Sequence, residues 1–375
     1  MFDRKIHLFS LFGFKVGLDI TWIFLAVLIT WSLATGLFPH YFEGMSQSTY
    51  WWMGIFGALG LFVSIVFHEF CHSLVARRFD LPMKGITLFL FGGVAEMNEE
   101  PQSPKSEFLM ALAGPVSSII LGLVFLAIAT GGEAVKLAKP VNAVMTYLMW
   151  LNFLLAGFNL LPAFPLDGGR ILRSVLWQIK GNLRWATRIA SSLGSGIGML
   201  LIVLGVISFI GGAFVGGVWY VLIGFFIRSA SQMSYKQMLV RRALGGEHVR
   251  QFMKTDPITV PASVSIEKLV REYFYKHHHK MYPVENSDGI AGCVTSKQIK
   301  QLPREQWAER TAKDIAVACS EENTVSPDTD AIEALGLMNK TGNSRLLVME
   351  NGRLAGVLTL KDMLKFLNLK IDLEQ

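Results

Sequence analysis

The residues that most clearly indicate a chemical function lie in the segment His68-Glu-Phe-Cys-His72. In a helix, positions i and i+4 lie about 40° apart on one face, so the imidazoles of His68 and His72 can bind one zinc ion. Glu69 projects about 100° away from His68, where its carboxylate can act as a general base toward a water at the metal. The pattern therefore predicts a hydrolytic zinc site built on a helix.

A catalytic zinc site also needs a third protein ligand and an open position. Asp167 is the best candidate, because it lies in the stretch 159–169 (NLLPAFPLDGG) at the end of another apolar segment. Pro162 and Pro165 should break the helix there and let Asp167 turn inward. Four glutamates nearer to the histidines along the chain are the alternatives: Glu96, Glu99, Glu100 and Glu107.

These side chains must be positioned by membrane-spanning helices. Hydrophobic residues make up 51% of the 375-residue chain and charged residues 17%, against roughly 25% charged in a soluble domain. This composition excludes a disordered or fibrous protein. Crossing a bilayer core takes about 20 apolar residues in a helix, and we expect six such spans: residues 20–38, 51–75, 108–130, 143–161, 189–210 and 213–227. A re-entrant hairpin is the alternative for the last two. The histidines and Asp167 fall near the same side of the membrane.

The distribution of basic residues orients the spans. Lysine and arginine gather on one side, at Arg4, Lys5, Lys15, Arg77, Arg78, Lys84, Arg170, Arg173, Lys180, Arg184, Arg188, Lys236, Arg241 and Arg242. Lys136 and Lys139 are the exceptions. By the positive-inside rule, both termini are cytoplasmic and the protein is a multi-pass protein of the cell membrane.

Residues 83–97 (MKGITLFLFGGVAEM) separate the second and third spans and mix β-branched and aromatic residues around Gly92-Gly93. We expect short strands at the membrane face, with a simple amphipathic loop as the alternative. Because an edge strand can pair with an extended peptide, these strands are a candidate substrate-binding edge.

The order of these motifs resembles the site-2 protease family of intramembrane zinc metalloproteases. The resemblance rests on HEFCH in one span, Ala113-Gly-Pro115 in the next and NLLPAFPLDGG after that, and it covers residues 50–170. It implies one Zn²⁺ per chain, bound by His68, His72 and Asp167. It further implies that Glu69 is the catalytic base, that Asn159 lies near the catalytic centre, and that the substrate is a transmembrane protein cut within or near its spans.

The C-terminal part of the chain is duplicated, with copies about 64 residues apart. Residues 289–295 (GIAGCVT) match 352–359 (GRLAGVLT), and each copy reads strand, helix, strand, strand, helix. This duplication resembles a tandem pair of CBS domains. The expected fold is therefore a polytopic α-helical membrane domain with short membrane-face strands (1–235), a linker (236–248) and an α/β tandem CBS pair (249–308 and 309–375).

The resemblance to CBS pairs implies an adenosine nucleotide, ATP or AMP, and a homodimer. The family's ribose-contacting pattern, Ser or Thr followed three residues later by Asp, is present as Thr359 and Asp362. In the first copy Gln298 replaces the acid after Thr295, so we expect at most one good nucleotide site. A pair that only dimerises is the alternative. Nucleotide binding would then regulate the protease by gating substrate entry.

Two other classes of function are alternatives to proteolysis. A transporter or channel regulated by CBS domains has no need for HExxH together with LDG, and a non-catalytic protease-like scaffold does not require Glu69. Nucleic acid is not an expected partner, because the net charge of +6 is spread along the chain and no basic stretch is interleaved with aromatics. The three widely separated cysteines exclude a disulfide framework and a cysteine-rich zinc site.

Overall fold

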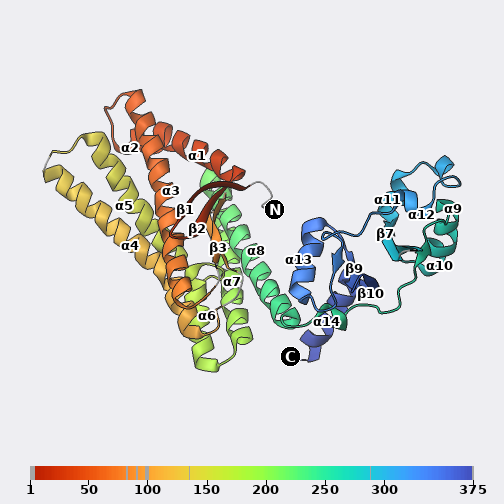
Figure 1. Ribbon diagram of the computed structural model, residues 1–375. Helices are drawn as coiled ribbons and strands as arrows, with labels where there is room; N and C mark the ends of the chain where they lie inside the picture. The colour runs from red at the N-terminus through yellow and green to blue at the C-terminus, as the bar shows by residue number, and fades with distance from the viewer. Residues whose placement is uncertain are drawn as a thin grey trace. The chain divides into compact units, whose positions relative to one another are not determined.

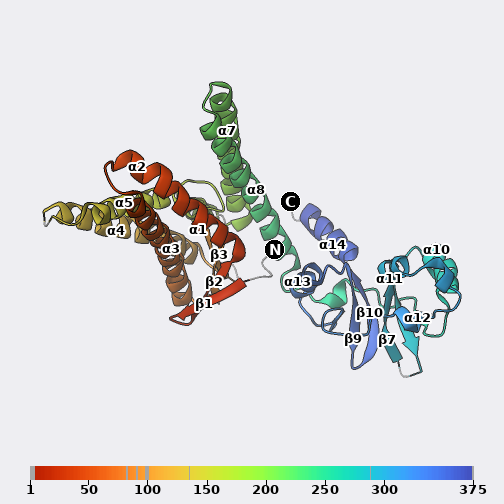
Figure 2. The ribbon, with the colours of Figure 1, turned by 90° about the horizontal axis from the view of Figure 1, so that it is seen from above.

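The computed structural model describes residues 5–81, 83–89, 92–97, 101–134, 136–287 and 289–373. The chain forms two compact units, Met1–Lys236 and Gln237–Gln375. Figures 1 and 2 show that the first unit is mainly helical, whereas the second combines short helices and strands.

Within the described residues, six helical segments are long and apolar enough to cross a membrane, which confirms the six expected spans. All six begin in the first unit, and the last one extends past its end at Lys236. The first consists of α1 (Ile20–Ser32), a π-helical turn (Leu33–Leu37) and α2 (Phe38–Tyr41). The others are α3 (Gln47–Arg78), α4 (Pro104–Ala134), α5 (Lys139–Asn159), α7 (Leu183–Ile210) and α8 (Phe214–Leu244). Large apolar side chains such as Leu154 and Ile210 are exposed on their outer faces, as expected for helices surrounded by lipid.

A short amphipathic helix, α6 (Asp167–Lys180), lies between α5 and α7 in the chain. The turn that separates it from α5 holds both Pro162 and Pro165, and α5 ends at Asn159 as their positions predict. Gly168 and Gly169 let this turn fold tightly over the start of α6, because a Cβ on Gly169 would lie 2.1 Å from the Phe164 nitrogen. The backbone thus places Asp167 in the first turn of α6, which is buried.

A four-stranded sheet lies beside α1 and α3 (Figures 1 and 2). Its order is β1 (Lys5–Leu11), β2 (Phe14–Asp19), β3 (Met83–Phe89) and β4 (Gly92–Met97). The strands expected in residues 83–97 are confirmed as β3 and β4. The β1–β2 hairpin was not predicted; β2 pairs in parallel with β3, and Phe14 and Val16 pack against Val66 and Phe70 of α3.

The second unit contains two similar three-stranded sheets, as the internal duplication predicts. The first copy comprises β5 (Val260–Pro261), α9 (Ile266–Leu269), α10 (Tyr275–His277), β6 (Met281–Asn286), β7 (Gly289–Thr295), α11 (Ser296–Gln301) and α12 (Ala312–Ile315). The second comprises β8 (Thr324–Val325), α13 (Ala331–Thr341), β9 (Arg345–Glu350), β10 (Arg353–Thr359) and α14 (Leu360–Leu373). In each copy the first strand is parallel to the second and the second is antiparallel to the third.

A cluster of buried apolar side chains from both copies joins the two sheets: Met281, Cys293, Leu347 and Val357. Helix α8 continues to Leu244, whose side chain is buried in the core of the second copy. Residues 236–244 of the stretch expected as a linker (236–248) are therefore helical.

Candidate active site

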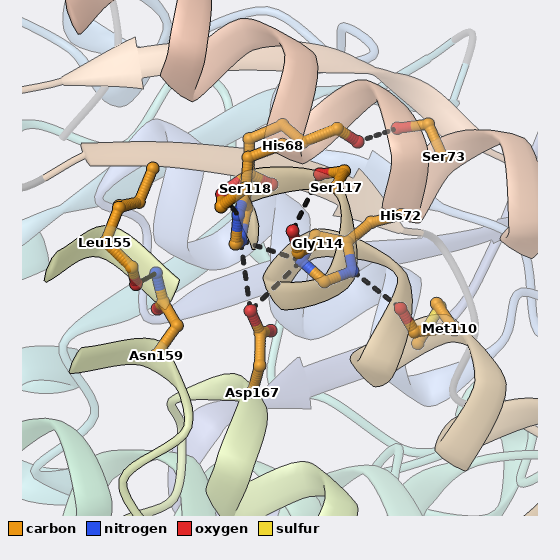
Figure 3. Close-up of polar contacts among 11 residues, drawn as sticks. His68, His72, Ser73, Met110, Gly114, Ser117, Ser118, Leu155, Asn159 and Asp167 are labelled. Carbon is orange, nitrogen blue, oxygen red and sulfur yellow. Dashed lines mark hydrogen bonds and ion pairs between the residues drawn. The ribbon is translucent and has the colours of Figure 1, made fainter. Parts of the chain in front are cut away.

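Three side chains predicted to bind zinc meet in the interior of the first unit (Figure 3). His68 and His72 project from α3, and Asp167 is the first residue of α6. The atoms His68 Nε2, His72 Nε2 and Asp167 Oδ2 are each 3.1 Å from the other two. All three residues are more than nine-tenths buried. Among the described residues, this is the one group of His, Cys, Asp and Glu that could hold a metal ion.

The triangle of donor atoms has the size that a zinc ion needs. Ligand atoms about 2.0–2.1 Å from a tetrahedral zinc ion lie about 3.3 Å from one another, close to the 3.1 Å found here. Two imidazoles and one carboxylate are a donor set that zinc accepts, and three protein ligands leave one position open. The geometry therefore fits a catalytic zinc site.

The outer nitrogens of the two imidazoles are held by α4. His72 Nδ1 lies 2.6 Å from the Met110 carbonyl oxygen. Because a carbonyl can only accept, His72 Nδ1 carries the hydrogen, and in the neutral ring Nε2 directs a lone pair at the cluster. His68 Nδ1 lies 2.9 Å from Ser118 Oγ, which fixes the second ring in a matching orientation. Without a cation, the lone pair of His72 Nε2 would face the Asp167 carboxylate.

Glu69 and Asn159 lie at the periphery of the cluster. Glu69 is half-buried on α3 and directly follows His68 in that helix. Asn159, the last residue of α5, donates its side-chain amide to the Leu155 carbonyl at 3.0 Å (Figure 3). The structure thus places Asn159 near the site but in a hydrogen bond with its own helix.

The structure describes two of the four alternative ligands, Glu107 and Glu96. Glu107 is fully buried on α4 and pairs with Arg173 of α6. It is therefore not one of the donors that meet at the histidines. Glu96 lies in β4, where only the backbone is described. Glu99 and Glu100 lie outside the described residues. Among the carboxylates that the structure describes, Asp167 is the one that lies against the histidines.

Comparison with known proteins agrees with this geometry. The model of peptidase family M50 matches residues 56–136 and 126–205. Rip3 of Mycobacterium tuberculosis, which carries the name of a zinc metalloprotease, is 34% identical to this chain over 358 residues, or 95% of the chain and 91% of Rip3. The chain belongs to peptidase family M50.

Another relative of this M50 peptidase agrees in name and extent. The zinc metalloprotease MJ0392 of Methanocaldococcus jannaschii is 30% identical over 368 residues, which cover 98% of this chain and 97% of MJ0392. A solved site-2 protease from the same organism is 29% identical and covers 61% of this chain and 94% of its own, with a TM-score of 0.43. The CBS domain model matches residues 249–304 and 312–369. The protein is a multi-pass zinc metalloprotease of the site-2 protease type with a tandem CBS pair.

Sequence reasoning missed several residues that shape the M50 site. Ser118 could have been found from the sequence, because it lies one helical turn after Gly114 and a histidine ligand needs a hydrogen-bond partner for Nδ1. The Met110 carbonyl had none, because every residue has a backbone carbonyl. In the sequence Gly114 stands out only as part of the motif Ala113-Gly-Pro115, yet it allows α4 to approach both imidazoles.

Replacing Gly114 by alanine is expected to reduce both zinc binding and proteolysis. An added Cβ would lie 2.2 Å from His72 Nε2 and 2.5 Å from His68 Nε2, so the rings or α4 must move. We expect zinc affinity to fall at least about 10-fold, as when groups that orient ligands are disturbed. Zinc competition with a chelator measures this loss. Gly157→Ala on α5, where a Cβ meets nothing within 4 Å, is the control; equal affinities for both variants would contradict the close approach.

Proposed function

We propose that this peptidase hydrolyses peptide bonds within or near the transmembrane segments of membrane-protein substrates, with zinc bound by His68, His72 and Asp167. The burial of this donor triangle among membrane-spanning helices carries the proposal. A peptide can reach donors in that position only by entering the helical bundle, so a membrane-embedded substrate fits better than a soluble one.

Zinc bound by such ligands supplies a Lewis acid that acidifies water and polarises a peptide carbonyl. In our proposal Glu69 accepts the proton of the attacking water and later returns it to the leaving amine. Met110 and Ser118 hold the imidazoles in the orientation that presents both Nε2 atoms. If Asn159 releases the Leu155 carbonyl, its amide can donate to the carbonyl oxygen that gains negative charge during the attack.

The substrate must be unwound to expose a peptide bond, because helical backbone groups are already paired. We propose that an extended substrate strand adds to β4, which ends the sheet order β1-β2-β3-β4. Main-chain hydrogen bonds along such an edge supply affinity with little dependence on sequence.

The test of proteolysis uses purified protein reconstituted with single-span membrane proteins. Wild-type protein should release fragments cut in or next to the span, and Glu69→Gln should not. Cleavage confined to soluble peptides would overturn the proposed substrate class.

We further propose that the CBS pair binds one adenosine nucleotide at Thr359 and Asp362 and thereby regulates the protease. Thr359 Oγ1 donates to Asp362 Oδ2 at 2.6 Å at the start of α14. Beside them is a cavity of about 420 Å³, whose polar lining residues are Ser344, Arg345, Thr359, Lys361, Lys365 and Asn368. Burial lowers the pKa of the Arg345 guanidinium, and the Asp362 carboxylate opposes this shift. A phosphate group would compensate such a partly desolvated cation.

Replacing Arg345 by alanine is expected to weaken ATP or AMP binding about 10-fold or more, the loss typical of one charge-assisted hydrogen bond. Isothermal titration calorimetry on the full chain measures the dissociation constant. The control is Lys297→Ala in the first copy, which removes one positive charge at the position equivalent to Lys361. It should change the affinity little, because the first copy has Gln298 in place of Asp362. Equal losses in both variants would indicate unspecific attraction of phosphate.

The proposed location is the cell membrane, with both termini and the CBS pair on the cytoplasmic side. The lysines and arginines of the loops support this orientation, since they gather beside alternate span ends. We also propose a homodimer formed through the CBS pair, the association that members of that domain family commonly show.

A further inference from the structure

A buried ion pair joins α4, which supports both imidazoles, to α6, which begins with Asp167. Arg173 Nε donates to Glu107 Oε1 at 2.7 Å, and a terminal nitrogen of the same guanidinium contacts the same oxygen. The exposed fractions are 0% for Glu107 and 3% for Arg173. Burying two charges is costly, and apolar residues of similar volume often stabilise a protein equally well. The pair therefore calls for a role other than stability.

One face of α4 carries the groups that support all three proposed ligands. Ser118 holds His68, and the Met110 carbonyl holds His72. Glu107 lies three residues before Met110, on the same face of the helix. It contacts Arg173, which lies on the helix that begins with Asp167.

Arg173 also contacts the turn that precedes Asp167. Its guanidinium carbon lies 4.7 Å from the centre of the Phe164 ring, within the range of a cation–π interaction. The same side chain thus ties α6 to α4 and to the backbone on the other side of Asp167. Because Asp167 is the first residue of α6, a shift of that helix moves its carboxylate directly.

We propose that Glu107 and Arg173 are a positioning pair that holds Asp167 at bonding distance from the metal. This inference rests on the proposed ligand set. Neither residue touches the donor atoms; they act on Asp167 through the placement of α6, as Met110 and Ser118 act on the imidazoles. A displacement of about 1 Å in such a ligand is enough to loosen a site.

The experiment measures zinc affinity in folded, detergent-purified full-length protein. In the double variant Glu107→Leu/Arg173→Met both charges are replaced by apolar groups of similar size, so the thermal midpoint Tm should stay near that of the wild type. We expect zinc to bind about 10–100-fold more weakly, and the visible absorption bands of the Co²⁺-substituted protein to shift. Wild-type zinc affinity in the folded double variant would overturn the proposal.

A second variant covers the case in which the double variant does not fold. Arg173→Lys keeps the buried positive charge but loses the forked contact with Glu107 and the flat contact with Phe164. We expect an intermediate loss of zinc affinity, and an unchanged affinity would again overturn the proposal. Thr187→Val on α7 is the control, since it removes only a buried hydroxyl that donates to Leu183 of its own helix, and it should bind zinc like the wild type.

A double-mutant cycle with Asp167→Ala separates this inference from the proposed ligand set. If the pair acts through Asp167, adding Glu107→Leu/Arg173→Met to Asp167→Ala causes no further loss of zinc affinity. Additive losses would overturn the positioning role and leave Asp167 as a ligand. If Asp167→Ala binds zinc like the wild type, the ligand set is wrong and the positioning role falls with it.

Discussion

Replacing Glu69 by glutamine is expected to abolish peptide-bond cleavage while leaving the zinc content unchanged. Glutamine has nearly the same shape as glutamate but cannot accept a proton from water. General acid–base catalysis contributes about 10²–10⁴-fold to rate, and cleavage should fall by at least that much. Zinc should remain, because the donor triangle consists of His68, His72 and Asp167 without Glu69. Cleavage of a reconstituted membrane substrate and elemental analysis of the same preparation measure the two effects.

Glu43→Gln is the matched control for this experiment, since Glu43 is exposed and lies outside the helix that carries the histidines. It should retain wild-type activity. An active Glu69→Gln variant would assign the general base to another group. Loss of zinc in that variant would show that the carboxylate supports the metal site directly.

Wild-type protein is expected to contain about one zinc ion per chain, and His72→Ala and Asp167→Asn should lose most of it. Each substitution removes one corner of the 3.1 Å donor triangle. Two remaining protein ligands are fewer than the three that catalytic zinc sites use. In Asp167→Asn the amide also lacks the negative charge that offsets that of the metal. Elemental analysis after dialysis against a weak chelator measures the loss, and cleavage should disappear with the zinc.

Asp80→Asn makes the same chemical change on the exposed turn after α3 and should leave the zinc content intact. If His72→Ala loses zinc and Asp167→Asn does not, the third ligand is one of the glutamates between residues 96 and 100. A folded wild-type protein without zinc would contradict the assignment of the whole site.

Regular local patterns explain what could be predicted for this protein. The spans followed from runs of about 20 apolar residues, and the pairing of His68 with His72 followed from the helical repeat. The duplicated C-terminal unit followed from repeated segments that fold alike. Each of these inferences depends on residues that are near neighbours in the chain or on copies of one pattern.

The β1–β2 hairpin was not predicted, because its residues show no clear strand pattern without their partner strand. Its alternating apolar residues are mixed with charges and precede a long apolar span. The hairpin becomes part of a sheet only through the pairing of β2 with β3, about 70 residues further along the chain. Strand preference depends strongly on such neighbours.

The amino-acid pattern was enough to identify the candidate catalytic residues: His68 and His72 on one helical face, Glu69 beside them, and an aspartate after a helix-breaking turn. The packing of the helices was needed to show that Asp167, and not Glu107, reaches the histidines. It also showed that Met110 and Ser118 orient the rings. The physical reason is that helix periodicity fixes angles within one element, whereas the distance between two elements depends on packing. At this site that distance is set where α4 contacts both α3 and α6.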